Sequence, residues 1–161
     1  MLQRADTIIA LDRDPARLAM AQHFGATHIV DAGGNDVVGQ VRSLTGGRGA
    51  DYVIECAGHA QAFRLSPEIL RPGGQLVWLG KINVDRDVAF RWGALMGEKR
   101  IVRSSYGGAR PRRDFPWLSR LYLDGKLKLD ELITRRIGLD QINEGFAAMT
   151  RGEIVRAVIV F

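Results

Sequence analysis

The chain has 161 residues and a formal net charge of +5, with 46% hydrophobic and 25% charged residues. This length allows one domain with a single core, and the hydrophobic content is too high for a disordered chain. The longest apolar runs, such as 157–161, are far shorter than the roughly 20 residues that a membrane-spanning helix needs. No membrane-spanning segment is therefore predicted.

Cysteine and histidine usage argues against a metal site. Cys56 is the single cysteine, so the chain cannot form an internal disulfide or supply the cysteine ligands of a structural zinc site. The three histidines, His23, His28 and His59, show no metal-binding spacing. We therefore expect no metal bound by this chain. The first residues lack the apolar region of a secretory signal, which predicts a cytoplasmic protein.

The positive charge raises the question of a polyanionic partner. The densest basic cluster, 110–113, lies in a stretch rich in glycine and proline and has only Tyr106 and Phe115 as aromatic neighbours. A solvated loop or a phosphate contact accounts for such a cluster. We predict that nucleic acid is not a partner.

Short apolar runs alternate with helical patterns along the first two thirds of the chain. Residues 7–11 form a nearly continuous apolar run that ends at Asp12, which is typical of a strand covered on both faces. Asp14-Pro15 then predicts the start of a helix, and Gly25 predicts its end. The next expected elements are strand 28–30, helix 36–44, strand 52–55, helix 61–70, a turn at 72–74, strand 75–80 and strand 100–104.

The pattern changes after Gly107-Gly108, where Pro111, Arg112, Arg113 and Pro116 are expected to interrupt any regular element. A boundary is therefore expected near residue 107. Beyond it the sequence predicts helix 115–124, strand 132–137, a helix capped by Asp140 and a terminal strand 155–161. Strands that alternate with helices of about ten residues indicate crossover connections, so the predicted fold is α/β, a doubly wound and mostly parallel Rossmann-like sheet with a C-terminal helix and strand arm.

Asp12 is the first candidate for a binding role. In a doubly wound sheet the ligand lies beyond the carboxyl ends of the strands, and an acid at the end of the second strand bonds the ribose hydroxyls of NAD. A carboxylate there also repels the 2′-phosphate of NADP. Arg17 is placed to reach the same ribose from the start of the helix. The alternative is that Asp12 is a simple turn residue.

The phosphate-binding glycine motif is missing. It should precede the acid by about 20 residues, yet Asp12 has only eleven residues before it. Gly33-Gly34 and the glycines of 46–49 do not have the required spacing. We therefore expect the chain to lack the first strand and its glycine loop, with residues 1–5 forming the last turn of the helix after that loop.

Several segments resemble one protein family. Residues 45–55, the motif Leu70-Arg71-Pro72-Gly73-Gly74, residues 25–27 and the ending 151–161 are similar to zinc-dependent medium-chain alcohol dehydrogenases. The similarity extends along almost the whole chain. Each segment is a weak signal, but their common order and spacing favour membership of this family.

The resemblance implies a set of NAD-binding residues. Asp12 and Arg17 would hold the adenine ribose, and Arg156 would contact the pyrophosphate, since a planar guanidinium suits phosphate oxygens. The alternative for Arg156 is an ion pair with a surface acid. The alternative for Cys56 is a core residue with no coenzyme contact. The remaining residues expected to line the coenzyme are Cys56, Ala57, Leu79, Gly80, Ser104 and Tyr106.

The resemblance also implies what the chain lacks. Residues 1–106 would be a partial dinucleotide-binding domain and 107–161 an arm that returns toward a catalytic domain, whose zinc ligands are not present here. We expect the coenzyme-binding part of an NAD-dependent alcohol dehydrogenase, truncated at its N-terminus, with no catalytic or metal-binding residue and negligible turnover by itself. The alternative is a non-catalytic nucleotide-binding or assembly module. The alcohol substrate is not predicted, because its pocket lies mostly on the missing domain.

A missing first strand has a structural consequence. In the usual strand order 3-2-1-4-5-6 it lies between the second and fourth strands, so its loss opens the centre of the sheet. Buried backbone groups without partners cost about 1 to 3 kcal/mol each. Either the two flanking strands close on each other, or the chain needs the rest of its polypeptide or another chain. The family resemblance further implies a homodimer through the sheet edge.

Overall fold

The computed structural model describes residues 5–161, which divide after Gly108 into two compact units. The boundary expected from the sequence lies two residues earlier, between 106 and 107. Most of the helical turn expected over residues 1–5 lies outside the described residues. No helix in the described part is long and apolar enough to cross a membrane.

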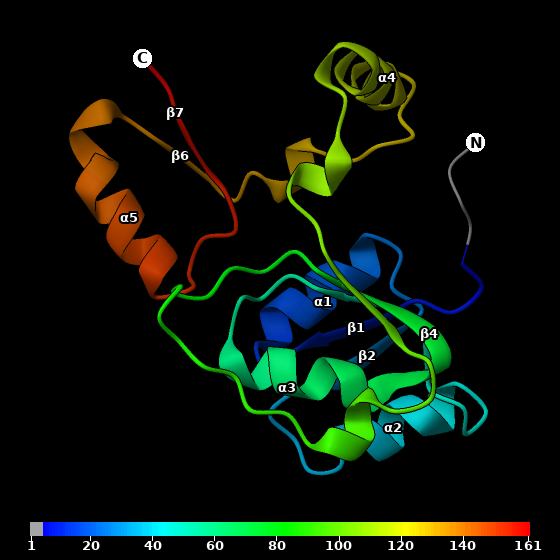
Figure 1. Ribbon diagram of the computed structural model, residues 1–161. Helices are drawn as coiled ribbons and strands as arrows, with labels where there is room; N and C mark the ends of the chain where they lie inside the picture. Colours follow the sequence, from blue (N-terminus) through cyan, green and yellow to red (C-terminus); the bar gives the residue numbers. More distant parts are fainter. Residues whose placement is uncertain (1–4) are drawn as a thin grey trace. The chain divides into compact units, whose positions relative to one another are not determined.

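The first unit alternates strands and helices (Figure 1). Its elements are β1 (Ile9–Asp12), α1 (Pro15–His23), β2 (His28–Asp31), α2 (Val37–Leu44), β3 (Ala50–Glu55), α3 (Ala60–Ile69), β4 (Leu70–Trp78), a short 3-10 turn Trp92–Leu95, β5 (Arg100–Arg103) and a second 3-10 turn Tyr106–Gly108. Every strand pair is parallel. The α/β class expected from the sequence is confirmed.

The strands of this unit form two sheets rather than one. β1 pairs with β2, and β3, β4 and β5 form a second sheet in that order. In the doubly wound order these strands correspond to strands two to six, so the break falls where the first strand belongs. The flanking strands β1 and β3 are not paired. The sequence-based possibility that they close on each other is therefore wrong for this structure.

Local signals fix the first helix. The Asp14 side chain accepts a hydrogen bond from the Ala16 backbone N–H at 2.8 Å, and Pro15 occupies the first helical position. The helix ends before Gly25, whose φ of 103° is a conformation that suits glycine. Both ends lie where the sequence predicts them.

β4 is the central strand of the second sheet and contributes side chains to its core. Leu76 is fully buried on the face that α3 covers. On the same face the ring of Trp78 lies edge-on to Phe63 and donates a hydrogen bond to the Ser66 hydroxyl at 3.0 Å. The turn expected at 72–74 is an irregularity within β4, because the register with β3 jumps from Leu70 to Gln75.

The opposite face of this sheet is largely bare. Ile54, Val77 and Val102 lie side by side across β3, β4 and β5. Ile54 is 62% exposed and Val102 41% exposed. Tyr52 shares this face and is 72% exposed. These exposures show that no element of the first unit covers this apolar surface. A doubly wound sheet is normally covered on both faces.

The second unit contains α4 (Pro111–Leu123), a 3-10 turn Asp130–Leu132, β6 (Arg135–Ile137), a 3-10 turn Leu139–Gln141, α5 (Ile142–Thr150) and β7 (Ala157–Ile159), with β6 and β7 paired in parallel. The expectation that prolines interrupt this region is wrong. Pro111 is the first helical residue, where its missing N–H costs nothing, and Pro116 lies inside α4.

Two further details of this unit differ from expectation. The strand predicted over 132–137 is limited to β6, because a 3-10 turn takes up Asp130–Leu132. Asp140 lies within the next 3-10 turn and does not cap α5, which has no side-chain cap. Short apolar stretches do not reveal whether they form a strand or a tight turn.

Candidate functional site

Asp12 is the last residue of β1, and its two carboxylate oxygens have different surroundings. Its Oδ1 accepts hydrogen bonds from the backbone N–H groups of Arg13 at 2.7 Å and Asp14 at 3.0 Å, which is a turn role. Its Oδ2 lies 3.9 Å from Nη1 of Arg17, and both side chains are partly exposed. One carboxylate oxygen is thus used by the turn, while the other, beside Arg17, is available to an outside donor.

Cys56 and Ala57 follow the end of β3 and are both exposed. Partial burial of the thiol, and to a lesser extent the Glu55 charge, raise the pKa of Cys56. A raised pKa keeps the thiol neutral near pH 7, so Cys56 is a poor nucleophile. The alternative that Cys56 is a core residue does not agree with its exposure.

Glu55 ties the ends of β3 and β4 together. Its backbone carbonyl accepts hydrogen bonds from the N–H groups of Leu79 at 2.8 Å and Gly80 at 2.9 Å, and its Oε1 accepts one from Gly58 at 2.8 Å. Glu55 is 5% exposed, and its Oε2 has no partner in residues 5–161. Glu55 was not predicted from the sequence, although a carboxylate that closes an apolar run is a visible signal.

The glycines at this junction are required by close contacts. A Cβ at Gly80 would collide with Glu55 Oε2 and with the Gly58 backbone, and a Cβ at Gly58 would collide with the Lys81 carbonyl. Gly58 also has a φ of 66°, which disfavours other residues. The predicted site residue Gly80 is therefore buried where the backbone after β4 passes close to Gly58. Leu79 beside it is partly exposed.

Ser104 and Tyr106 follow β5. The Ser104 N–H donates to the Trp78 carbonyl at 3.1 Å, which continues the ladder one residue past β5. The Tyr106 side chain is 87% exposed. Arg103, just before them, donates from Nη1 to the Gly80 carbonyl at 3.1 Å and so links the ends of β4 and β5. The ends of β3, β4 and β5 are thereby joined along one edge.

Arg156 belongs to the second unit. Its backbone carbonyl accepts hydrogen bonds from the N–H groups of Thr134 at 3.0 Å and Arg135 at 3.3 Å, which holds the start of β7 beside β6. Its exposed guanidinium makes no ion pair with any residue of 5–161. The alternative that Arg156 pairs with a surface acid is not observed.

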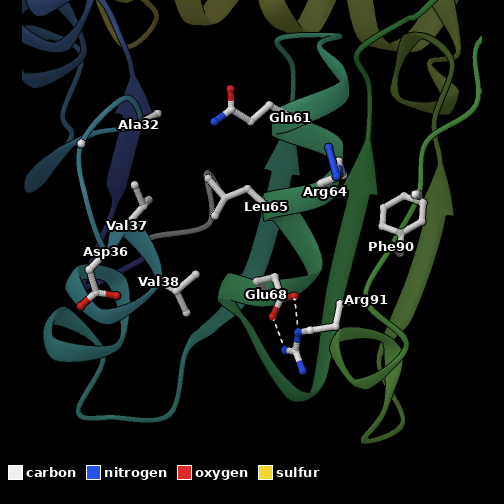
Figure 2. A pocket seen from close by; sticks show the side chains of 12 residues that line it. Ala32, Asp36, Val37, Val38, Gln61, Arg64, Leu65, Glu68, Phe90 and Arg91 are labelled. Carbon is white, nitrogen blue, oxygen red and sulfur yellow. Dashed lines mark hydrogen bonds and ion pairs between the residues drawn. The ribbon is translucent and has the colours of Figure 1, made fainter.

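A cleft of about 710 Å³ lies elsewhere in the first unit (Figure 2). Four residues on one face of α3, Gln61, Arg64, Leu65 and Glu68, line it together with the start of α2 and residues 89–91. None of the residues predicted from the sequence lines this cleft. It was missed because three segments distant in sequence form it, and no single motif marks it.

Glu68 and Arg91, which both line the cleft, form a bidentate ion pair, and this pair gives a testable prediction. Arg91 binds Glu68 through Nε at 2.8 Å and Nη2 at 2.5 Å (Figure 2), and this hydrogen bonding lowers the pKa of Glu68 below its ordinary value. A lowered carboxyl pKa contributes stability at neutral pH that is lost as the pH falls through the folded-state pKa. Arg91→Ala should raise the pKa of Glu68 and flatten the loss of stability below about pH 4.5.

NMR titration of the Glu68 carboxyl and urea unfolding at neutral and acid pH measure both effects. Arg64→Ala is the matched control, because Arg64 lies on the same helix face and has no hydrogen bond or ion pair to a described residue. The assignment of the shift to Arg91 fails if the pKa of Glu68 is the same in Arg91→Ala and in the parent chain. The stability effect should be small, since the pair is partly exposed.

Comparison with known proteins identifies the family. The sequence profile described as "Zinc-binding dehydrogenase" matches residues 2–124. This chain is a member of the zinc-binding dehydrogenase family. It is 34% identical to S-(hydroxymethyl)glutathione dehydrogenase from Paracoccus denitrificans, over 99% of this chain and 44% of that protein. It is 33% identical to alcohol dehydrogenase class-3 from Cereibacter sphaeroides, over 99% of this chain and 45% of that protein.

Solved dehydrogenases share the fold. An alcohol dehydrogenase zinc-binding domain protein from Burkholderia ambifaria matches 96% of this chain and 41% of its own, with 31% identity and a TM-score of 0.88. A zinc-binding dehydrogenase from Sinorhizobium meliloti bound to NADP matches 98% of this chain and 46% of its own, with 28% identity and a TM-score of 0.85. This zinc-binding dehydrogenase chain thus spans less than half the length of the relatives it matches.

The family name raises the question of zinc. Among residues 5–161 no group of three histidine, cysteine, aspartate or glutamate side chains is placed to hold a metal ion. The residues present therefore do not fit a catalytic or structural zinc site. Asp12 is the last residue of β1, and Cys56 and Gly80 follow β3 and β4, so all three lie at the carboxyl ends of parallel strands, where doubly wound folds bind their ligands.

Proposed function

We propose that the chain is the coenzyme-binding part of an NAD-dependent, zinc-type alcohol dehydrogenase. The observation that carries this proposal is the position of Asp12, whose Oδ2 lies at the carboxyl end of β1, 3.9 Å from Nη1 of Arg17. The bound coenzyme would accept a hydride when an alcohol is oxidised to an aldehyde and would return it in the reverse reaction. The chain's own contribution is to bind and orient that coenzyme.

Each proposed contact follows from the chemistry of the residue. Asp12 accepts hydrogen bonds from the adenine ribose hydroxyls, with Arg17 beside it, and its negative charge disfavours a 2′-phosphate. The guanidinium of Arg156, which makes no ion pair with any residue of 5–161, provides a planar fork for the pyrophosphate. Cys56 and Ala57 line the coenzyme cleft, and Leu79 and Gly80 lie beside the nicotinamide ribose. Ser104 and Tyr106 flank the nicotinamide amide.

Calorimetry with NAD and NADP tests this function. We expect the chain to bind NAD measurably and NADP more weakly, because the free oxygen of Asp12 can accept from ribose hydroxyls but repels phosphate. The comparison is informative because one solved relative is bound to NADP. Equal affinity for the two coenzymes, or tighter binding of NADP, would contradict the assignment of Asp12. We expect negligible alcohol oxidation by these 161 residues alone.

The second candidate is an assembly module, favoured by the outer edge of β5. β5 pairs only with β4 in the described part of the chain, and Val102 on it is 41% exposed. We propose a homodimer in which β5 of one copy adds to β5 of the other. Sedimentation of the parent chain and of Ile101→Pro tests this. The Ser104 N–H faces β4 and backbone groups alternate sides, so proline at position 101 removes an N–H from the outer edge of β5. A monomeric parent chain excludes the dimer.

A further inference from the structure

Glu55 is a buried carboxylate with one oxygen that has no partner. Only 5% of the residue is exposed, and its Oε2 has no hydrogen-bond partner among residues 5–161. A buried acceptor without a partner lowers the stability of a folded chain, and an apolar side chain of similar volume does not carry this cost. Stability alone therefore does not explain a glutamate at this position.

The carboxyl group of Glu55 contacts two loops. Its Oε1 accepts a hydrogen bond from the Gly58 N–H at 2.8 Å, which closes the loop 56–58 around Cys56 and Ala57. Its Oε2 lies against Gly80, since a Cβ added to Gly80 would collide with this oxygen and with the backbone of Gly58. The carboxyl group thus lies where the loop 56–58 and the loop 79–80 come together.

The backbone of Glu55 holds the loop 79–80 independently of the side chain. Its carbonyl accepts hydrogen bonds from the N–H groups of Leu79 at 2.8 Å and Gly80 at 2.9 Å. These two bonds are retained whichever side chain residue 55 carries, whereas the bond to Gly58 needs an acceptor oxygen on that side chain. Removal of this oxygen should therefore release the loop 56–58 and leave the loop 79–80 in place.

We infer that Glu55 is a positioning residue for the coenzyme, which fixes the loop 56–58 relative to the loop 79–80. This inference rests on the proposed function, in which the first loop lines the coenzyme cleft and the second lies beside the nicotinamide ribose. The role is geometric. It requires an acceptor oxygen within reach of the Gly58 N–H, and it does not require a negative charge on residue 55.

Two ligands separate this role from a general effect on folding. NAD is proposed to contact both loops as well as Asp12 and Arg17, whereas AMP has no nicotinamide half and is proposed to depend mainly on Asp12 and Arg17. Release of the loop 56–58 should therefore weaken the binding of NAD more than that of AMP. The ratio of the two dissociation constants is the readout, because partial unfolding weakens both ligands by the same factor.

Two substitutions of Glu55 test the geometric role by calorimetry. Glu55→Met removes the acceptor oxygen and should weaken NAD relative to AMP by about tenfold, the order expected when the backbone of about one residue must be ordered again on binding. Its stability should change little, because the unpartnered Oε2 is exchanged for an unpartnered Gly58 N–H. Glu55→Gln retains an oxygen that can accept from Gly58, so it should keep the parent ratio.

Amide hydrogen exchange checks the same substitution without a ligand. In Glu55→Met the Gly58 amide should exchange faster than in the parent chain, while the amides of Leu79 and Gly80 should stay protected. If Glu55→Met does not fold, Glu55→Leu, which also lacks an acceptor oxygen, takes its place. Equal exchange of the Gly58 amide in the parent and the variant would overturn the inference.

Ser66→Ala is the control for lost stability. Ser66 is 3% exposed, donates to the Phe63 carbonyl at 2.7 Å and accepts from Nε1 of Trp78 at 3.0 Å. Its substitution should destabilise the first unit and leave the ratio of NAD to AMP affinity unchanged. A change of that ratio in Ser66→Ala as large as in Glu55→Met would show a general structural effect and overturn the positioning role.

The remaining outcomes separate the inference from the proposed function. If the parent chain binds NAD through Asp12 but Glu55→Met keeps the parent ratio, the positioning role is wrong and the proposed function stands. If Glu55→Gln weakens NAD as much as Glu55→Met does, Glu55 acts through its charge, and the geometric role is likewise wrong. A parent chain that binds neither NAD nor AMP contradicts the proposed function and this inference together.

Discussion

Leu76→Ala should lower the free energy of unfolding of the first unit by about 2 to 5 kcal/mol. Leu76 is fully buried at the centre of β4, on the face that α3 covers. Removal of its side chain leaves a cavity on the face of the sheet where the rings of Phe63 and Trp78 pack edge-on. Urea unfolding followed by circular dichroism measures the change.

Ile54→Ala is the matched control for this prediction. Ile54 is on the neighbouring strand but on the bare face, 62% exposed, so its truncation should cost about 0.5 kcal/mol or less. If Leu76→Ala does not fold, Leu76→Met, which conserves volume, should cost less than about 1.5 kcal/mol. Equal losses for Leu76→Ala and Ile54→Ala would show that the two faces of the sheet are covered alike, contrary to the structure.

Asp12→Asn should weaken NAD binding by about 10- to 100-fold, because a charge-assisted hydrogen bond contributes about 1.5 to 3 kcal/mol. The asparagine oxygen can still accept from Arg13 and Asp14, so the turn and the fold should be retained. The loss of charge also removes the repulsion of a 2′-phosphate. The preference for NAD over NADP should therefore shrink in calorimetric titrations.

Asp31→Asn is the control for Asp12→Asn. Asp31 closes β2 directly beside Asp12 in the register, and its carboxylate likewise accepts a backbone N–H, from Gly33 at 2.8 Å. Its substitution should leave NAD affinity unchanged. If both variants weaken binding equally, the effect is one of general charge, and Asp12 has no special role.

Local signals were sufficient to predict most elements of the fold. Short runs of three to seven mostly apolar residues predicted the strands, and Asp14-Pro15 with Gly25 predicted both ends of α1. The prediction failed where backbone geometry depends on other segments. Nothing local in Pro72-Gly73-Gly74 shows that these residues remain within β4 as a break in register with β3.

The candidate site was predicted less completely. Asp12 and Gly80 could be selected from the sequence, because strand ends are visible in it and a doubly wound fold places ligands at those ends. Glu55 was missed because its role depends on contacts with Gly58, Leu79 and Gly80, which only the folded chain brings together. The α3 cleft was missed for the same reason.

The most direct test of the proposed coenzyme site is an NMR titration of the isotope-labelled chain with NAD. We predict that the largest chemical-shift changes occur at Asp12, Arg17, Cys56 and Gly80, at the carboxyl ends of the strands, with little change at Gln61 and Arg64. Changes centred instead on the residues of the α3 cleft would show that the ligand binds elsewhere, and the account of Asp12 as the ribose-binding residue would be wrong.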